Sequence, residues 1–345
     1  MQSASEPVTK MPMNDLTGLL PRRSLLRMLA LAAALGVTGP TLVTTAAAQT
    51  PQKLEVVATT GMIADALRQV GGERINVEAL MGPGVDPHLY RQTRTDIVRM
   101  TRADAVIWHG LYLEAQLEEF FADLSKRKKV VALGERLDKG QLLGHEEYKG
   151  RYDPHVWMDP KLWREVVIAA RDTLSELDPT GRSSFEANAT RHLSDIDRLA
   201  SYSETVLSSV PQGARVLVTA HDAFNYFGRA YGFEVLGIQG ISTESEAGLR
   251  QVEAFVNTLV ERKIKAVFVE SSVADRNVKA LIEGAAARGW AVEIGGELYS
   301  DAMGETGTYE GTYIGMIDHN VSTIARALGG SVPQRGMNDR LAALK

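Results

Sequence analysis

The hydrophobic positions of the chain fall into short blocks whose spacing changes repeatedly between two residues and three or four residues. A spacing of two is typical of strands and a spacing of three or four is typical of helices, so the pattern predicts alternating strands and helices from residue 53 onward. Such alternation favours parallel sheets wrapped by helices. In the first half, strands are expected at 54–58, 75–81, 105–108 and 130–133, and helices at 62–70, 95–102, 113–126 and 160–177.

A second series of the same kind begins after residue 215. Its strands are expected at 216–219, 234–238, 266–269 and 291–294, and its helices at 224–231, 249–263, 273–288 and 311–328. The two halves share this order of elements, although no sequence repeat indicates a duplication. The pattern therefore predicts an α/β protein made of two βα lobes with parallel-type sheets.

Between the two series lies the most regular helical segment of the chain, residues 183–209. It contains no glycine or proline, and Pro211 and Gly213 follow its end. At 1.5 Å per residue the helix would be about 40 Å long. We interpret it as one long rigid linker helix between the lobes; a helix packed wholly against one lobe is the alternative. The expected domains are an N-terminal lobe at 49–182, the linker helix at 183–210, a C-terminal lobe at 211–330 and a tail at 331–345.

Residues 1–48 have the features of a targeting segment. Arg22 and Arg23 precede an apolar stretch at 28–37, and the alanines at 46–48 offer a cleavage site. We interpret the segment as a twin-arginine signal peptide, with the general secretory route as the alternative. The chain has no cysteine, so no lipid attachment through cysteine is expected. These features predict an exported, periplasmic protein without a lipid anchor.

Three histidines and one aspartate follow expected strands or turns, and they are the candidate metal ligands: His88, His155, His221 and Asp301. In open α/β sheets, ligands bind beyond the carboxyl ends of the strands, so these side chains are expected to meet between the lobes. Three imidazoles and one carboxylate suit a first-row divalent ion such as Zn²⁺ or Mn²⁺. Because the spacing lacks a compact metal motif, hydrogen-bonded structural histidines are the alternative.

Four acidic residues near these positions could support such a centre. Asp86, Asp153 and Asp222 flank the histidines and are candidates to accept the second imidazole N–H, or else to cap local turns. Glu270 ends an expected strand and either supports the site or forms a surface salt bridge. Because ligating imidazoles must be neutral, metal affinity is expected to fall as the pH drops through about 6.5.

Longer stretches around these residues resemble a known family. The chain from about residue 54 to residue 330 is similar to the metal-binding solute-binding proteins of ABC importers for zinc and manganese (cluster A-I, the TroA-like family). The matching stretches are GVDPHLY at 84–90, DPHVWMD at 153–159, AHDAFNYF at 220–227, QGIST at 239–243, VESSV at 269–273 and GELYSDAMG at 296–304.

This resemblance implies both a site and a function. It places the metal ligands on His88, His155, His221 and Asp301, and the helix between the lobes on residues 183–209. It implies a transport protein with no catalytic residues, in which two metal-binding lobes capture Zn²⁺ or Mn²⁺ for delivery to an ABC permease with a separate ATPase. We expect a monomer. A net charge of −5 gives no reason to expect a nucleic acid partner.

Two departures from the family leave the choice of metal open. Zinc-specific members often carry a long His-rich loop before the second ligand, whereas residues 134–152 hold only His145. Manganese relatives commonly have Glu where this chain has His221, and imidazole favours zinc. His109 stands where relatives often have Asn and is not expected to be a ligand.

A secreted zinc-dependent hydrolase with a three-His site is the alternative from another functional class. Such an enzyme needs a water molecule in the fourth position of the metal. An adhesin-like surface protein is a third interpretation, which the missing lipidation cysteine disfavours.

Overall fold

The structure is a computed structural model that describes residues 53–145 and 148–342. Residues 50–345 group into one compact unit. The expected signal peptide at 1–48 lies outside the described residues. None of the described helices combines the length and the apolar character needed to cross a bilayer.

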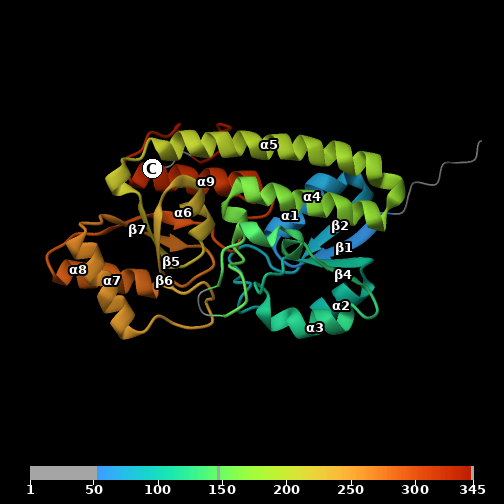
Figure 1. Ribbon diagram of the computed structural model, residues 1–345, viewed down its shortest axis with the longest axis horizontal. Coiled ribbons are helices and arrows are strands. Elements are labelled where there is room, and N and C mark those ends of the chain that lie inside the picture. The colour runs from blue at the N-terminus through green and yellow to red at the C-terminus, as the bar shows by residue number, and fades with distance from the viewer. Residues whose placement is uncertain (1–52, 146–147, 343–345) are drawn as a thin grey trace, which may run out of the picture. The chain divides into compact units, whose positions relative to one another are not determined.

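The first half of the unit is built on a four-stranded parallel sheet with the order β2-β1-β3-β4 (Figure 1). Its strands are β1 (Leu54–Ala58), β2 (Ile75–Ala79), β3 (Ala105–Trp108) and β4 (Lys129–Ala132), and its helices are α1 (Gly61–Gly71), α2 (Arg94–Arg102), α3 (Glu118–Leu124) and α4 (Pro160–Leu177). Val56 packs with α1 and α4, whereas the next residue, Val57, packs with α2 and α3. Side chains alternate across a strand, so helices cover both faces of this sheet.

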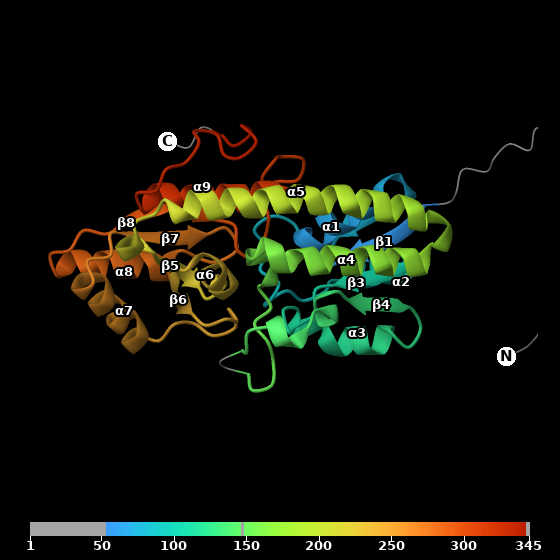
Figure 2. The ribbon, with the colours of Figure 1, turned by 45° about the horizontal axis from the view of Figure 1, so that its top comes forward.

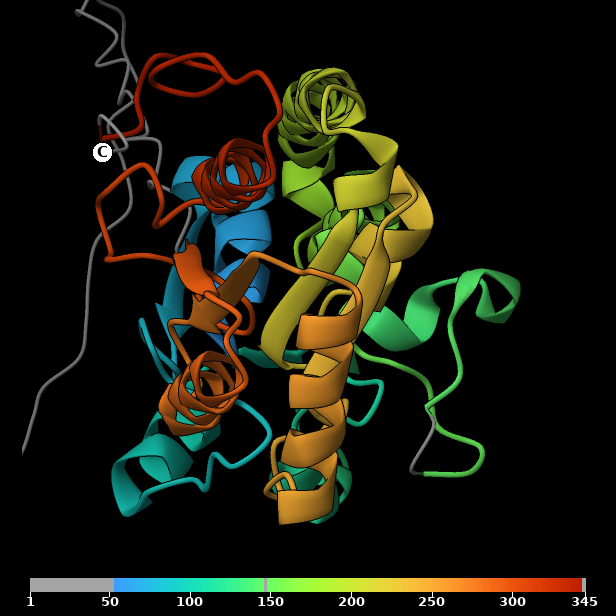
Figure 3. The ribbon, with the colours of Figure 1, turned by 90° about the vertical axis from the view of Figure 1, so that its left-hand side faces the viewer.

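The second half contains two pairs of parallel strands. Strand β5 (Val216–His221) pairs with β6 (Glu234–Gln239), β7 (Ala266–Glu270) pairs with β8 (Glu293–Leu298), and the helices are α6 (Asn225–Tyr231), α7 (Leu249–Glu261), α8 (Arg276–Ala287) and α9 (Tyr313–Ala327). Strand β5 lies beside β7. Figure 3 shows α7 and α8 on one side of these strands and α9 on the other. Val267 accordingly packs in the cluster of α7 and α8, and Phe268 packs in the cluster that includes α9.

Helix α5 (Arg182–Ser208) runs along both halves (Figure 2). It packs on α1 and α4 of the first half and on α9 of the second. Its inward side chains, such as Phe185 and Leu199, belong to a hydrophobic cluster that continues through all three of those helices. The prediction of two βα lobes joined by one long helix is confirmed. The domain boundaries after 182 and 210 stay a prediction, because this cluster runs across both without a break.

Helix α3 is shorter than the predicted helix at 113–126. A 3₁₀ turn (Ala115–Leu117) precedes it, because Leu111 and Tyr112 adopt positive φ angles of 55° and 71° and turn the chain there. The buried Glu114 then points inward and accepts the amide hydrogens of two residues that follow β3. An inward carboxylate at this point interrupts the apolar spacing on which the prediction rested.

The tail after α9 folds back onto that helix. Asp318 of α9 is fully buried, and its two oxygens accept the backbone N–H of Met337 at 3.0 and 2.9 Å and the hydroxyl of Tyr309 at 2.9 Å. Gly336 permits this approach, because its φ is +74° and an added Cβ would lie 2.6 Å from the Asp318 oxygens. The tail thereby binds α9 and the loop at 299–312 together.

Candidate metal centre

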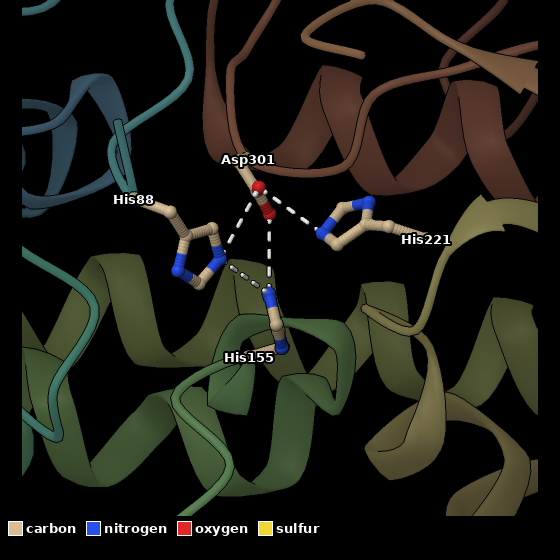
Figure 4. Close-up of side chains that lie close together, drawn as sticks. All are labelled: His88, His155, His221 and Asp301. Carbon is tan, nitrogen blue, oxygen red and sulfur yellow. Dashed lines mark hydrogen bonds and ion pairs between the residues drawn. The ribbon is translucent and has the colours of Figure 1, made fainter. Parts of the chain in front are cut away.

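Four side chains that are far apart in the sequence meet between the two halves of the unit (Figure 4). His88 lies in the loop after β2, His155 precedes a 3₁₀ turn that leads into α4, His221 ends β5, and Asp301 follows β8. Each is at most 2% exposed. The structure thus brings together all four candidates from the sequence.

Distances within this group suit a tetrahedral ion. The Asp301 carboxylate lies 3.1 Å from His221 Nε2, 3.4 Å from His155 Nε2 and 3.6 Å from His88 Nε2. The Nε2 atoms of His88 and His155 are 3.4 Å apart. Ligand atoms around a tetrahedral zinc with bonds of about 2.0–2.1 Å are about 3.4 Å apart. One atom from each side chain lies within 4.8 Å of all the others, so the four can hold a first-row divalent ion.

Carboxylates orient two of the three imidazoles. Asp153 Oδ1 lies 2.7 Å from His155 Nδ1 and accepts the backbone N–H of His155 at 3.0 Å. Glu270 Oε2 lies 2.5 Å from His221 Nδ1, and Oε1 accepts the backbone N–H of His221 at 2.8 Å. A carboxylate at Nδ1 keeps that nitrogen protonated and leaves Nε2 to face the metal. Because Glu270 is 4% exposed, the surface salt bridge is excluded.

The same contact explains why β5 is longer than expected. The predicted strand at 216–219 extends to His221, which pairs with Gln239 of β6. The bond from the His221 backbone to Glu270 joins β5 to the end of β7, and it keeps the backbone extended up to the imidazole. His221 therefore stands on a strand rather than in a loop.

The other two flanking aspartates make different contacts. Asp86 Oδ1 accepts the backbone N–H of His88 at 2.8 Å rather than an imidazole hydrogen, and its Oδ2 accepts the Thr243 hydroxyl at 2.6 Å. Thr243 belongs to the loop after β6, so this contact links the two halves beside His88. Asp222 accepts a hydrogen bond from its near neighbour Asn225 at 2.9 Å. No spacing signal in the sequence points to the contact between Asp86 and Thr243.

Burial and neighbouring charges set the ionisation of the two paired histidines. Burial by itself lowers the pKa of His155, but the Asp153 carboxylate outweighs burial and raises this pKa to about 9. Burial opposes the charged form of His221 as well, yet the carboxylates of Glu270 and Asp301 hold its pKa well above the ordinary value. Both rings therefore bind protons tightly when no metal competes for them.

The pKa values of His88 and Asp301 are lowered rather than raised. Burial lowers the pKa of His88 to about 3, so this ring is neutral. Burial tends to raise the pKa of Asp301, but the facing rings of His221 and His155 hold it well below the usual range. Neither oxygen of this ionised, buried carboxylate has a hydrogen bond of acceptable geometry among the described residues. A buried carboxylate needs a neighbouring cation. The protonated rings of His155 and His221 supply it in the metal-free protein, and a metal ion that displaces their protons would take over this role.

Two aromatic side chains connect the two halves near the centre. The Trp157 ring lies 5.3 Å from the His155 ring, and its Nε1 donates to the backbone oxygen of Ser300 at 2.8 Å. The Tyr226 hydroxyl donates to the backbone oxygen of Asp153 at 2.8 Å. Each aromatic residue therefore ties a segment that carries a candidate ligand to the other half.

The remaining histidines near the site have other contacts. His109 Nε2 donates to the backbone oxygen of Pro154 at 2.7 Å, and burial lowers the pKa of His109 to about 3. This neutral ring braces the segment just before His155. His145 accepts the backbone N–H of Tyr148 at 3.3 Å and lies outside the four-residue group.

Comparisons with known proteins found a matching family model and similar proteins. The family model described as zinc-uptake complex component A, periplasmic, matches residues 56–327. The manganese-binding lipoprotein MntA of Bacillus subtilis is 46% identical over 277 residues, which are 80% of this chain and 90% of the relative. The manganese ABC transporter substrate-binding lipoprotein PsaA of Streptococcus mitis is 30% identical over 285 residues, 80% of this chain and 90% of the relative. The solved structure of the periplasmic zinc binding protein TroA from Treponema pallidum is 46% identical, with a TM-score of 0.78, and the match covers 80% of this chain and 99% of that chain.

The names of these relatives contradict the predicted location. The sequence predicted a periplasmic protein without a lipid anchor, whereas the relatives from Bacillus subtilis and Streptococcus mitis are named lipoproteins. The prediction rested on the missing cysteine, and an absent residue type is a weak basis for a location. Similar proteins are thus named as lipid-attached, and the prediction of a location without a lipid anchor is wrong on this evidence.

The family itself does not depend on location. The match covers both halves, the helix between them and all four candidate ligand positions. Relatives at 46% and 30% identity extend over four fifths of the chain. The chain therefore belongs to the zinc-uptake component A family, the TroA-like metal-binding solute-binding proteins of ABC importers.

Proposed function

We propose that this chain captures one divalent ion, Zn²⁺ or Mn²⁺, between its two halves and delivers it to an ABC permease. The proposed ligands are His88, His155, His221 and Asp301. The observation that carries the proposal is the convergence of three Nε2 atoms on one buried carboxylate that lacks a hydrogen bond among the described residues. A divalent cation at that point would offset the cost of burying the charge.

The donor set restricts the class of metal. Imidazole nitrogen binds first-row ions such as Zn²⁺ well, and carboxylate oxygen suits Mn²⁺. Relatives of this chain are named for either metal, with the zinc protein and one manganese protein at the same 46% identity. By affinity alone the site should prefer Zn²⁺, because Mn²⁺ lies lowest in the order of divalent first-row ions.

The geometry does not favour the hydrolase alternative. The family consists of substrate-binding transport proteins, and a zinc hydrolase keeps one metal position for water. Here the Asp301 carboxylate lies within 3.6 Å of all three facing imidazole nitrogens and would take that fourth position. We infer that the chain is not an enzyme and that the bound ion is cargo.

The partners follow from the family. One relative is named as the substrate-binding protein of a manganese ABC transporter, and such a protein works with a membrane permease and an ATPase. We propose that both are separate subunits and that this chain delivers its metal as a monomer.

Metal binding is tested by thermal unfolding and calorimetric titration of the chelator-treated protein with Zn²⁺, Mn²⁺ and Mg²⁺. A ligand at 100 times its dissociation constant stabilises the folded state by about 2.7 kcal/mol. We expect Zn²⁺ and Mn²⁺ to raise the melting temperature and Mg²⁺ to leave it unchanged. His221→Ala and Asp301→Ala should each lose most of the increase.

His319→Ala is the matched control, because His319 Nε2 donates to the backbone oxygen of Glu297 at 2.9 Å and His319 is not one of the four converging residues. This variant should keep the full increase. An equal increase in all three variants would place the metal elsewhere, and no increase in the unmodified protein would refute metal capture.

A further inference from the structure

A cavity of about 330 Å³ lies between the two halves and reaches Asp301. One wall comes from the start of α1 and the loop after β2, and it includes Gly61, Gly82 and Val85. The other wall comes from the loop that begins at Asp301 and includes Met303 and Gly304. Val85 lies three residues before His88, so both walls are segments that carry proposed ligands.

The size and the lining of this cavity suit a hydrated ion. Six water molecules at roughly 30 Å³ each occupy about 180 Å³, so a divalent ion with its first shell of water fits. Polar residues such as Thr60 and Thr306 line it next to apolar residues such as Met81. Asp301 is one of the lining residues, and its carboxylate is fully buried behind the lining, without a hydrogen bond among the described residues.

Besides Asp301, the lining contains one basic and one acidic residue, Arg68 and Glu78. Arg68 donates to the backbone oxygen of Val77 at 3.0 Å, and Glu78 pairs with Arg99 at 3.0 Å. The Glu78 carboxylate is paired and the Arg68 guanidinium keeps its positive charge, so a cation is held more weakly by this lining than by the carboxylate of Asp301.

The two walls approach each other where Gly61 faces Met303. A Cβ added to Gly61 would lie 3.1 Å from Met303 Cε, which is closer than an ordinary contact. The flexible thioether side chain of Met303, 7% exposed, therefore fills the space over the first turn of α1. Beyond it, residues 305–308 are exposed.

A wide separation of the two halves would break more contacts than a movement of Met303 and the loop after it. The hydrophobic cluster that includes α1, α4, α5 and α9 runs through both halves, and the Asp86–Thr243 bond joins them beside His88. Movement of one side chain and of a short exposed loop disturbs none of these contacts.

We propose that this cavity is the passage through which a hydrated divalent ion reaches and leaves the centre, with Met303 over Gly61 as its gate. The inference rests on the proposed metal capture and adds the route. A residue that lines the route without touching the bound ion changes the barrier for entry and for exit by the same factor. The association and dissociation rates then change together, and the dissociation constant stays the same.

The test narrows the proposed passage by placing a bulky side chain on its wall. Gly82→Trp is suited to this, because an added Cβ at Gly82 meets nothing within 4 Å. Zn²⁺ association is followed by stopped-flow tryptophan fluorescence, and dissociation is followed by transfer to excess chelator. We expect both rates to fall at least about tenfold, with the dissociation constant unchanged within about threefold. Met303→Ala widens the gate and should raise both rates together.

Gly213→Trp is the matched control. Gly213 also has open space around an added Cβ, and it lines a different cavity of about 420 Å³ at the amino end of β5, the end opposite to His221. Its rates should equal those of the unmodified protein. Thermal unfolding of all three variants checks that each is folded.

Two outcomes would overturn the passage. If Gly82→Trp and Met303→Ala both leave the rates unchanged, the ion takes another route. If either variant changes the dissociation constant through one rate alone, that residue acts on the bound state. Failure of the proposed function has a different signature, because the unmodified protein would then bind no Zn²⁺ in the equilibrium titration.

Discussion

At the scale of single residues, the centre depends on carboxylates that stand behind the imidazoles. Asp153 is two positions from His155, so its contact follows from local sequence and was among the predicted options. Glu270 is 49 residues from His221, and only the position of both at neighbouring strand ends hinted at the pairing. The Asp86–Thr243 contact joins two irregular loops, for which periodicity contains no information.

Replacing a supporting carboxylate by its amide should weaken metal binding without removing a ligand. Glu270→Gln and Asp153→Asn each keep the size of the side chain but lose the charge that orients the ring and strengthens its donor nitrogen. We expect each to lower the Zn²⁺ affinity by about 10–100-fold in competition titrations. Asp222→Asn is the control, since Asp222 bonds Asn225 and no imidazole. An equal loss in the control would show a general effect of charge.

The raised pKa values predict proton release on binding. At pH 7.5 the metal-free protein carries protons on His155, with a pKa of about 9, and on His221, whose pKa is also raised, whereas His88 is neutral with a pKa of about 3. A metal must displace both protons, so about two should be released per ion, and log affinity should rise by about two per pH unit between pH 6.5 and 8. Calorimetry in buffers of different ionisation enthalpy measures this number.

Imidazoles with ordinary pKa values would release far fewer protons on metal binding. Three imidazoles with the ordinary pKa of 6.5 would together release only about 0.3 proton at pH 7.5. A value near this would contradict the role of the carboxylates. The sequence alone predicted that metal affinity falls as the pH drops through about 6.5, because it does not show which imidazoles face carboxylates. The raised pKa of His155 also stabilises the metal-free fold below pH 6.5, and this contribution is lost as the pH rises toward 9.

At the scale of elements, regular patterns were predicted well and irregular ones were not. The bounds of β1 and β3 match the prediction, and those of α5 differ by one residue at each end, because their apolar spacing is uninterrupted. Helix α3 was predicted too long, since an inward Glu114 and two positive φ angles break the pattern. The docking of the tail was not predicted, because it rests on one buried carboxylate in α9.

Removing that carboxylate should release the tail. Asp318→Ala leaves the Met337 N–H and the Tyr309 hydroxyl without their acceptor, so we expect the free energy of unfolding to fall by about 1–3 kcal/mol. Hydrogen exchange should become faster in residues 331–342 and in the loop at 299–312. Asp339→Asn removes a mostly exposed charge of the same tail and keeps a residue type that tolerates the φ of 53° at this position, so it should change neither. Unchanged exchange in Asp318→Ala would refute the anchoring role.

At the scale of the whole molecule, the sequence predicted two lobes, the helix between them and the four residues that meet. Strand order within each sheet, the single hydrophobic cluster through both halves and the cavity beside Asp301 required the structure. These features depend on how long segments pack, and hydrophobic spacing reports only which side of a segment is buried. Location was the prediction that failed, since it was argued from an absent residue type.

The four proposed ligands lie at positions 88, 155, 221 and 301, so a bound ion would close three loops of the chain at once. Unfolding of either half would break the ring of contacts and lose the ion. Cross-links across long loops act mainly by restricting the unfolded chain. The loaded protein should therefore resist proteases that attack opened chains, while the empty protein is degraded sooner. The amount of this protein that survives would then follow the supply of its own cargo.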